Sequence, residues 1–254
     1  MAQIRKYTLP GTIEMMNLGD VHMGSPAHDA KLFQKAVEYI KAHDDCYWVS
    51  TGDLLDVALK DSKSDVYTAM PLEKEFKLLT EALAPIADKC LGIVGSNHHH
   101  RFDRSVGMSL DQLLCDKLGV PFLGITGLVN VVCDKAAYYV AMHHGFGGGR
   151  TRGAKTANLA YFGTIIPGAD LYLSGHTHTY VSFPEDIPYI DRKRGLLVDY
   201  QAHFVCTAHF LKWKNSYGES KLYKPSTPGA ALVTLHAHAT GNRNSKRVDS
   251  ALFN

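Results

Sequence analysis

Asp20 and His22 are the residues of this sequence whose types and spacing most directly suggest chemistry. They follow an apolar run at residues 13–18, which predicts a buried strand, and a glycine. In open α/β sheets, ligands bind in the crevice outside the carboxyl ends of the strands. A carboxylate oxygen and an imidazole nitrogen that turn toward one point suit a divalent metal ion. An Asp-x-His sequence is common by chance, so this pair alone indicates little.

The same arrangement, an apolar run followed by polar residues that can bind a metal, recurs four more times downstream. The residues are Asp53 and Asp56, Asn97 and His98, His143 and His144, and finally His176 and His178. Carboxylate, amide and imidazole ligands without a thiolate favour Mn, Fe, Zn or Co over Mg or Ca, which prefer shells made only of oxygen. The five clusters together therefore indicate a transition-metal site.

Composition places few limits on function. The chain has 254 residues, 45% of them hydrophobic and 20% charged, with a net charge of +2 and 14 histidines. This length can bury a full core as one α/β domain. The small net charge does not imply a nucleic-acid partner, although it leaves room for a local basic patch.

The sequence predicts a cytoplasmic protein. Residues 1–6 lack the apolar region of a signal peptide, and no apolar run approaches the length of a membrane span. The cysteines are odd in number, far apart and without a Cys-x-x-Cys pair, so we expect them to be reduced and mostly buried. They are Cys46, Cys90, Cys115, Cys133 and Cys206.

Hydrophobic periodicity predicts strands alternating with helices. The expected helices are 31–43, 71–89 with a kink or end at Pro85, 109–118 with Ser109 and Gln112 as a capping box, and 151–162. The expected strands are 13–18, 47–51, 91–95, 129–133, 137–142, 171–174, 181–183, 195–200 and 231–237. The polar tail 241–254 is expected to be loosely held. Without repeats or linkers, we interpret 1–254 as one domain.

The ordered motifs resemble those of the calcineurin-like metallophosphoesterases. That family carries Asp-x-His, Gly-Asp-x-x-Asp, Gly-Asn-His-Asp/Glu, a lone His after a strand, and Gly-His-x-His, in this order. The match covers residues 20–178. Residues 179–254 lie outside it and are expected to complete a sheet and form a rim around the substrate. The resemblance implies a four-layer α-β-β-α sandwich with two mixed β-sheets.

The resemblance also implies two divalent metal ions, with Mn favoured and Fe, Zn, Co or Ni as alternatives. Asp20, His22 and His178 would bind the first ion. Asn97, His176 and one histidine of the fourth motif would bind the second, and Asp53 would bridge both. His143 is favoured over His144, because it is the first residue off the strand and alternation along a strand argues against both facing the metals.

In such a site, water between the metals becomes a hydroxide that attacks phosphorus in line. The family's Asn-His motif supplies the acid that protonates the leaving oxygen, which here is His98. Three departures stand out. In the first, Ser96 separates Gly95 from Asn97. In the second, His99 replaces the acid that normally orients the catalytic histidine, so Asp56 or another nearby carboxylate would orient His98 instead. The usual arginine after the second motif is missing, and Arg101 or Arg104 would bind the phosphate instead.

Other polar clusters admit ordinary interpretations. We expect His28, His43, His203, His209, His236 and His238 to be polar residues without a metal, and the glycine-rich 145–149 to be a flexible loop near the site. His99 and His100 are expected to line the cleft. Residues 212–214 and 221–224 interleave lysines with aromatic residues. They fit solvated loops, a strand-binding surface or a rim that selects the substrate.

The sequence therefore predicts a dinuclear metal-dependent phosphoesterase acting on a phosphate-ester substrate, with a phosphodiesterase or nuclease favoured. The main alternative is a phosphomonoesterase, including a protein phosphatase. A non-catalytic scaffold with the same fold is the alternative from another class, but such proteins lose metal ligands and here every ligand position is filled. A nucleic-acid partner is left open, no membrane partner is expected, and the oligomeric state is not indicated.

Overall fold

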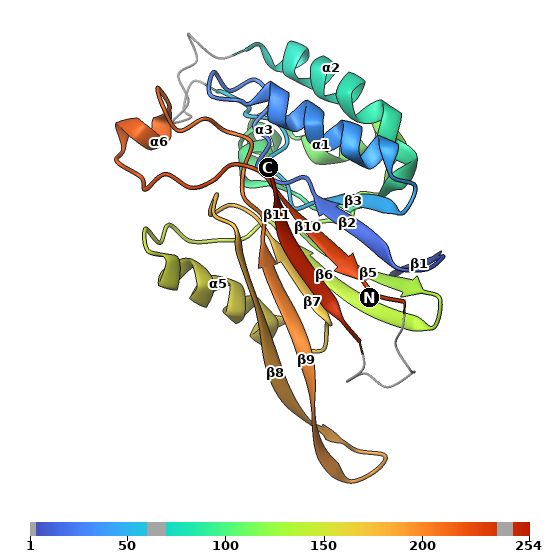
Figure 1. Cartoon of the computed structure of the whole chain (residues 1–254). Coiled ribbons are helices and arrows are strands. Elements are labelled where there is room, and N and C mark those ends of the chain that lie inside the picture. Colours follow the sequence, from blue (N-terminus) through green and yellow to red (C-terminus); the bar gives the residue numbers. More distant parts are fainter. Residues whose placement is uncertain (1–3, 60–69, 238–245) are drawn as a thin grey trace.

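The computed structural model describes residues 4–59, 70–237 and 246–254, and it contains two β-sheets with helices on their outer faces (Figure 1). The larger sheet has six strands in the order β1-β5-β6-β7-β9-β8. Its strands are β1 (Arg5–Leu9), β5 (Thr126–Cys133), β6 (Ala136–His143), β7 (Leu171–Ser174), β8 (Val181–Asp191) and β9 (Leu196–Cys206). β7 runs parallel to β6 and β9, whereas the β5–β6 and β8–β9 pairs are antiparallel, so the sheet is mixed.

The smaller sheet has five strands in the order β11-β10-β2-β3-β4. They are β2 (Ile13–Asn17), β3 (Cys46–Ser50), β4 (Cys90–Ile93), β10 (Ala230–Leu235) and β11 (Val248–Phe253). β2, β3 and β4 are parallel, and β10 is antiparallel to both of its neighbours. The carboxyl ends of β2, β3 and β4 therefore lie at one edge of this sheet.

Most of the helices cover the outer faces of the two sheets, and one short helix stands apart from them (Figure 1). The helices are α1 (Ala30–Ala42), α2 (Leu72–Leu83), the 3₁₀ helix η1 (Ala84–Lys89), α3 (Asn97–Val106), α4 (Leu110–Leu118), α5 (Arg152–Ile165) and the short α6 (Tyr217–Ser220). α1, α2 and α4 pack on the five-stranded sheet and α5 packs on the six-stranded sheet. None of the described helices is both long and apolar enough to cross a membrane.

Three separate hydrophobic clusters show that the molecule has four layers. One cluster includes Phe33 of α1 and Trp48 of β3, and fills the space between the helices α1, α2 and α4 and the five-stranded sheet. A second includes Met15 of β2 and Val131 of β5, and lies between the two sheets. The third includes Phe162 of α5 and Phe204 of β9. The predicted four-layer sandwich with two mixed sheets is therefore confirmed.

Local signals in the sequence explain where several helices begin and end. The Ser109 side chain accepts a hydrogen bond from the Gln112 N–H at the start of α4, and Gly119 ends the helix in a left-handed conformation with φ 69°. Such a conformation suits glycine because it has no Cβ. Pro85 ends the α-helical part of the predicted helix 71–89, which continues as η1.

Several elements differ from the prediction. The end of the predicted loose tail forms β11, paired with β10, because its alternating side chains complete the sheet; residues 241–245 of that tail lie outside the described residues. Residues 97–106 form α3, which the polar histidine run concealed. β8 and β9 are 11 residues each and longer than expected, since most of their length pairs only with each other.

Candidate metal centre

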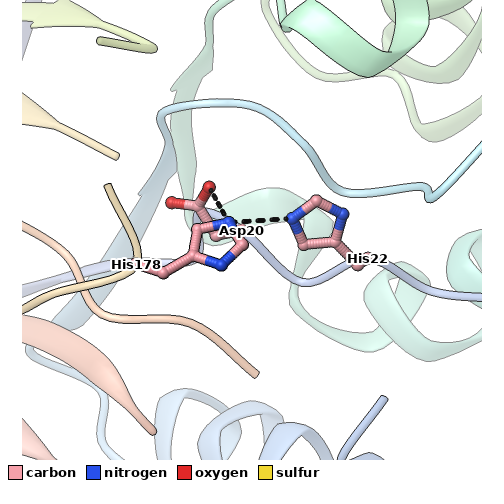
Figure 2. Close-up of side chains that lie close together, drawn as sticks. All are labelled: Asp20, His22 and His178. Carbon is pink, nitrogen blue, oxygen red and sulfur yellow. Dashed lines mark hydrogen bonds and ion pairs between the residues drawn. The ribbon is translucent and has the colours of Figure 1, made fainter. Parts of the chain in front are cut away.

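Asp20, His22 and His178 converge where β2 and β7 end (Figure 2). His178 Nε2 lies 3.2 Å from Asp20 Oδ1 and 3.2 Å from His22 Nε2. Asp20 and His22 are almost fully buried, whereas about a third of the His178 side chain is exposed. These three residues form the first candidate ligand set, and the structure brings them together as the sequence predicted.

A second set continues from the first through Asp53. The Asp53 Oδ2 atom lies 3.1 Å from His144 Nε2, which in turn lies 3.3 Å from His176 Nδ1. The Asn97 amide Nδ2 lies 3.3 Å from the same His176 nitrogen, and rotation of the amide would present its oxygen there instead. Ligand atoms of Asp20, Asp53 and His144 all lie within 4.8 Å of one another, so the two sets are contiguous.

The fourth-motif residue that faces this cluster is His144, not His143. Side chains alternate along β6, and the ring of His143 turns toward Phe162 of α5, with 5.8 Å between ring centroids. Its Nδ1 accepts a hydrogen bond from the Gly145 N–H. His144 instead turns inward, and its Nδ1–H donates to the Thr51 carbonyl. The structure thus differs from the expectation for His143, because β6 extends through His143 and the first residue beyond the strand, which faces the cluster, is His144.

The backbone of these loops adopts an unusual conformation at five candidate ligands. Their φ angles lie between 48° and 67°, in the left-handed region that side chains other than glycine rarely adopt. The five residues are Asp20, His22, Asp53, His176 and His178. Residues held in this region cost free energy and cluster at functional sites, where surrounding structure enforces them.

Hydrogen bonds hold the two buried carboxylates in place. The His176 N–H lies 3.0 and 2.9 Å from the two oxygens of Asp20, and the His98 N–H donates to Asp53 Oδ1 over 3.1 Å. The backbone of the first motif pairs with that of the second, since the Asp20 N–H donates to the Gly52 carbonyl. Gly175 lies so close that a Cβ there would stand 2.5 Å from Asp20 Oδ2. The site therefore depends on backbone contacts between strand ends.

Burial and mutual charge shift the pKa values of these groups in opposite directions. Burial opposes ionisation of Asp53, but the surrounding histidines, led by His144, hold its pKa well below the usual range. Burial likewise disfavours the charged form of His144, yet Asp53 and Asp20 raise its pKa to about 9. For His176, burial and the neighbouring His144 lower the pKa. The carboxylates are thus ionised at neutral pH.

His98 lies beside the two sets, with about a fifth of its side chain exposed. Its Nδ1–H donates to the backbone carbonyl of Asp56 over 2.7 Å, and its Nε2 lies 3.8 Å from Asp53 Oδ2. The carboxylate of Asp56 lies 3.8 Å from His98 Nδ1 but closer, 3.2 Å, to His22 Nδ1. The backbone of Asp56 therefore orients His98, while its carboxylate orients His22.

The two candidate phosphate-binding arginines lie on α3. The side chain of Arg101 is outside the part of the chain that the structure describes. The Arg104 Nε–H donates to His100 Nε2 over 3.2 Å at the exposed surface of the helix. This contact does not bring Arg104 against the candidate ligands.

His99 is fully buried and does not line the cleft, which differs from its expected position. Its Nδ1–H donates to Asp111 Oδ1 over 2.5 Å, and its Nε2 accepts a hydrogen bond from the Leu55 N–H. The other oxygen of Asp111 accepts from the Ser96 N–H. The His99–Asp111 pair therefore joins α3 and α4 to the loop that carries Asp53 and Asp56. The only feature of the sequence that pointed to this pair was His99 itself, which stands where the family usually has an acid.

Two more residues near the site were missed by sequence reasoning. Asn17 is fully buried and joins the sheets, because its side chain accepts from Thr51 and its carbonyl accepts from the Thr207 hydroxyl. Glu75 of α2 is also buried, and its carboxylate accepts from the Val57 N–H. Burial raises the pKa of Glu75 to about 7. His209 was interpreted as an ordinary polar residue, and it hydrogen-bonds Ser226 rather than a candidate ligand.

The donor atoms match what a metal ion requires. Ligands about 2.1 Å from a tetrahedral or octahedral ion stand about 3.0–3.4 Å apart, and the separations above are 3.1–3.3 Å. The Nδ1–H of His22 donates to the Asp56 carboxylate, and that of His144 donates to the Thr51 carbonyl. In both rings Nε2 is left to bind a metal, as is usual for metal-ligating histidines. Within the described residues, the ion pairs of Asp20 and Asp53 are all with histidines. These residues fit a divalent metal.

Comparison with known proteins finds similarity only at the level of structure. No protein-family model matches this sequence, and no curated protein matches it. Solved structures that resemble it include the calcineurin-like phosphoesterase YfkN from Bacillus subtilis, at 10% identity and a TM-score of 0.47, covering 96% of this chain and 91% of that one.

Two other solved structures also align with this chain over almost the full length of both chains. A predicted phosphoesterase from Streptococcus pneumoniae has 12% identity and a TM-score of 0.40, with 95% of this chain and 90% of that one covered. Vps29 from Chaetomium thermophilum has 12% identity and a TM-score of 0.44, with 94% and 96% covered. At these identities and TM-scores, conclusions about this chain depend on its own residues.

We predict that His99→Ala lowers the free energy of unfolding by about 2–4 kcal/mol, because Asp111 is left buried without its partner. Urea unfolding of the metal-free protein measures this. His100→Ala, one position along the same helix but exposed, should change stability by no more than about 0.5 kcal/mol. Equal effects of the two substitutions would contradict a structural role for the His99–Asp111 pair.

Proposed function

We propose that this chain is a dinuclear metal-dependent phosphoesterase that acts on phosphodiesters, with nucleases included. The observation that carries the proposal is the contiguity of the two ligand sets: nitrogen and oxygen atoms from both sheets stand 3.1–3.3 Å apart around Asp20 and Asp53. A single structural histidine cluster would not need two adjacent buried carboxylates, whose mutual repulsion has to be offset by bound cations, protonated partners or hydrogen-bond donors.

The residues divide into two groups around a shared carboxylate. Asp20, His22 and His178 would hold one ion, and Asn97, His144 and His176 would hold the other. Asp53 would contact both, because it lies against His144 and close to Asp20. Imidazole, carboxylate and amide ligands favour Mn, with Fe, Zn, Co or Ni as alternatives. Two such ions lower the pKa of the water they share and neutralise charge that develops on the phosphoryl oxygens.

His98 is positioned to deliver a proton to the leaving oxygen. Its ring is fixed through Nδ1 by the Asp56 carbonyl, so the protonated form carries its second proton on Nε2, the side that faces Asp53 and the metal cluster. Asp56 acts through other residues. Its backbone carbonyl orients His98, and its carboxylate accepts the Nδ1 proton of His22, which leaves Nε2 of that ring unprotonated. Both contacts fix geometry before substrate binds.

The preference for diesters is supported by the surroundings of the site. Two basic segments, residues 144–152 and 207–229, lie beside it and can contact the second ester arm, which a monoester lacks. A phosphomonoesterase remains the second candidate, because the ligand set alone serves either substrate. A non-catalytic scaffold is disfavoured, since every ligand position is occupied by a residue that can bind a metal.

Turnover tests the function directly. The metal-stripped protein, reloaded with Mn²⁺, should hydrolyse bis-nitrophenyl phosphate faster than nitrophenyl phosphate, and neither without metal. Faster turnover of the monoester would replace the proposal by a phosphatase. No turnover of either ester, together with binding of fewer than two metal ions per chain, would indicate a scaffold.

A matched pair of neighbouring histidines tests the metal site. His144→Ala should weaken binding of one of two Mn²⁺ ions by at least about 10-fold, because an inner ligand is lost. His143→Ala should leave both affinities within about twofold, since its ring faces α5. Calorimetric titration measures both. The reverse pattern would make His143 the ligand.

The role of His98 can be separated from metal binding. His98→Asn should lower diester turnover by about 10²- to 10⁴-fold, the usual contribution of a positioned general acid, while two metal ions still bind. Turnover is followed by nitrophenol release and metal content by elemental analysis, with His100→Ala as control. If the variant loses metal as well, His98 is a ligand and not the acid.

A further inference from the structure

Two basic segments far apart in the sequence meet beside the metal centre. They are the loop between β6 and α5, residues 144–152, and the connection between β9 and β10, residues 207–229, which contains α6. We call them together the basic rim. Arg150 Cζ lies 5.4 Å from the centroid of the Tyr223 ring, which joins the two segments. Figure 1 shows the α6 connection and the loop before α5 side by side.

The rim concentrates positive charge. Its two segments contain six lysines and arginines and one acidic residue, a net charge of +5, whereas the whole chain carries only +2. The basic residues are Arg150, Arg152, Lys212, Lys214, Lys221 and Lys224. The one acid, Glu219, accepts a hydrogen bond from the Asn215 N–H within the same turn. Such a local field attracts a polyanion.

Aromatic rings are interleaved with these charges and partly exposed. Tyr217 is 42% exposed, Tyr223 41% and Phe146 41%. The Tyr217 and Tyr223 rings lie edge to face, 6.1 Å apart, and Lys221 lies over the Tyr217 ring. Trp213 donates its indole N–H to the Tyr223 carbonyl and so supports the cluster. Partly exposed rings among cations can stack on unpaired bases while the cations bind phosphates.

The rim is fastened to the metal centre itself. The Ser226 hydroxyl donates to the His178 carbonyl, and His209 Nε2 lies 3.0 Å from the same hydroxyl. At the other end of the segment, the Phe210 N–H donates to the Asp20 carbonyl. Tyr223 is only three residues before Ser226, so its backbone lies within about 10 Å of that of Ser226. The segment 207–229 is therefore hydrogen-bonded at both ends to the backbone of candidate ligands, His178 and Asp20.

We propose that the basic rim binds single-stranded nucleic acid and delivers its phosphodiester backbone to the metal centre. This inference rests on the proposed phosphodiesterase function and names its substrate class. A double helix offers phosphates but hides its base faces, whereas a single strand presents both. Arg150 and the lysines of the rim would therefore bind the phosphates, and Tyr217 and Tyr223 would stack on the bases.

Binding to the metal-free protein tests the rim without turnover. Fluorescence anisotropy of labelled 20-nucleotide oligo-dT and oligo-U, in EDTA, should show binding of at least one strand that weakens with salt. The tighter of the two identifies DNA or RNA. A duplex of equal length and polyglutamate should bind more weakly. Equal binding of either competitor would overturn the proposal, because charge alone would then explain it.

Variants identify the binding residues. Tyr223→Ala and Tyr217→Ala should each weaken single-strand binding by about 5- to 100-fold, as expected for loss of one base stack. Arg150→Ala should weaken binding too, and it should make the plot of log affinity against log salt less steep by about 0.7, the value for one lost phosphate contact. Controls are Tyr139→Ala in β6, where the ring is 42% exposed, and Lys193→Ala in the turn between β8 and β9. Both should bind like the unaltered protein.

The outcomes for this inference and for the proposed function are separable. If the unaltered protein hydrolyses bis-nitrophenyl phosphate but binds neither oligonucleotide, the rim proposal fails and the phosphodiesterase proposal stands. If it binds single strands but hydrolyses no diester, the phosphodiesterase proposal fails. Equal losses in Tyr223→Ala and Tyr139→Ala would also overturn the role of the rim.

Discussion

The structure depends on keeping two carboxylates, Asp20 and Asp53, buried beside each other. Ionised carboxylates at such positions are stable only when cations or hydrogen-bond donors compensate them. Here backbone N–H groups of His176 and His98 donate to them, and histidines from both sheets lie around them. Much of the local structure serves this compensation, including the left-handed backbone at five of the candidate ligands.

The four-layer arrangement makes this compensation possible. β2 and β3 bring Asp20 and Asp53 to one edge of the five-stranded sheet, and β6 and β7 bring His144, His176 and His178 from the six-stranded sheet. Asn17 joins the two sheets directly below the site, because its side chain and its backbone carbonyl accept hydrogen bonds from Thr51 and Thr207. Since the candidate ligands come from different sheets, a metal ion bound by them would couple its site to the packing of the two sheets.

The surroundings of the metal centre are asymmetric. On one side, α3 and α4 hold the proposed acid His98 and its supports through the buried His99–Asp111 pair. On another, the basic rim adds charge and aromatic surface from loops. In the proposed function, the rigid strand ends would carry the chemistry that many phosphoesters share, and the loops would distinguish one substrate from another, as loops on a rigid scaffold often do.

The sequence by itself predicted β2 to β10, most helix ends and the order of the motifs, because hydrophobic periodicity and capping residues are local signals. It missed β1, β11 and α3. It identified Asp20, His22, Asp53, Asn97, His176 and His178, which the structure brings together. It favoured His143 over His144, whereas His144 is the one that faces the cluster, because the orientation depends on where β6 ends relative to α5. The pairing of His99 with Asp111 and of Arg150 with Tyr223 joins segments distant in the chain. Only tertiary packing decides such contacts, since no local propensity encodes them.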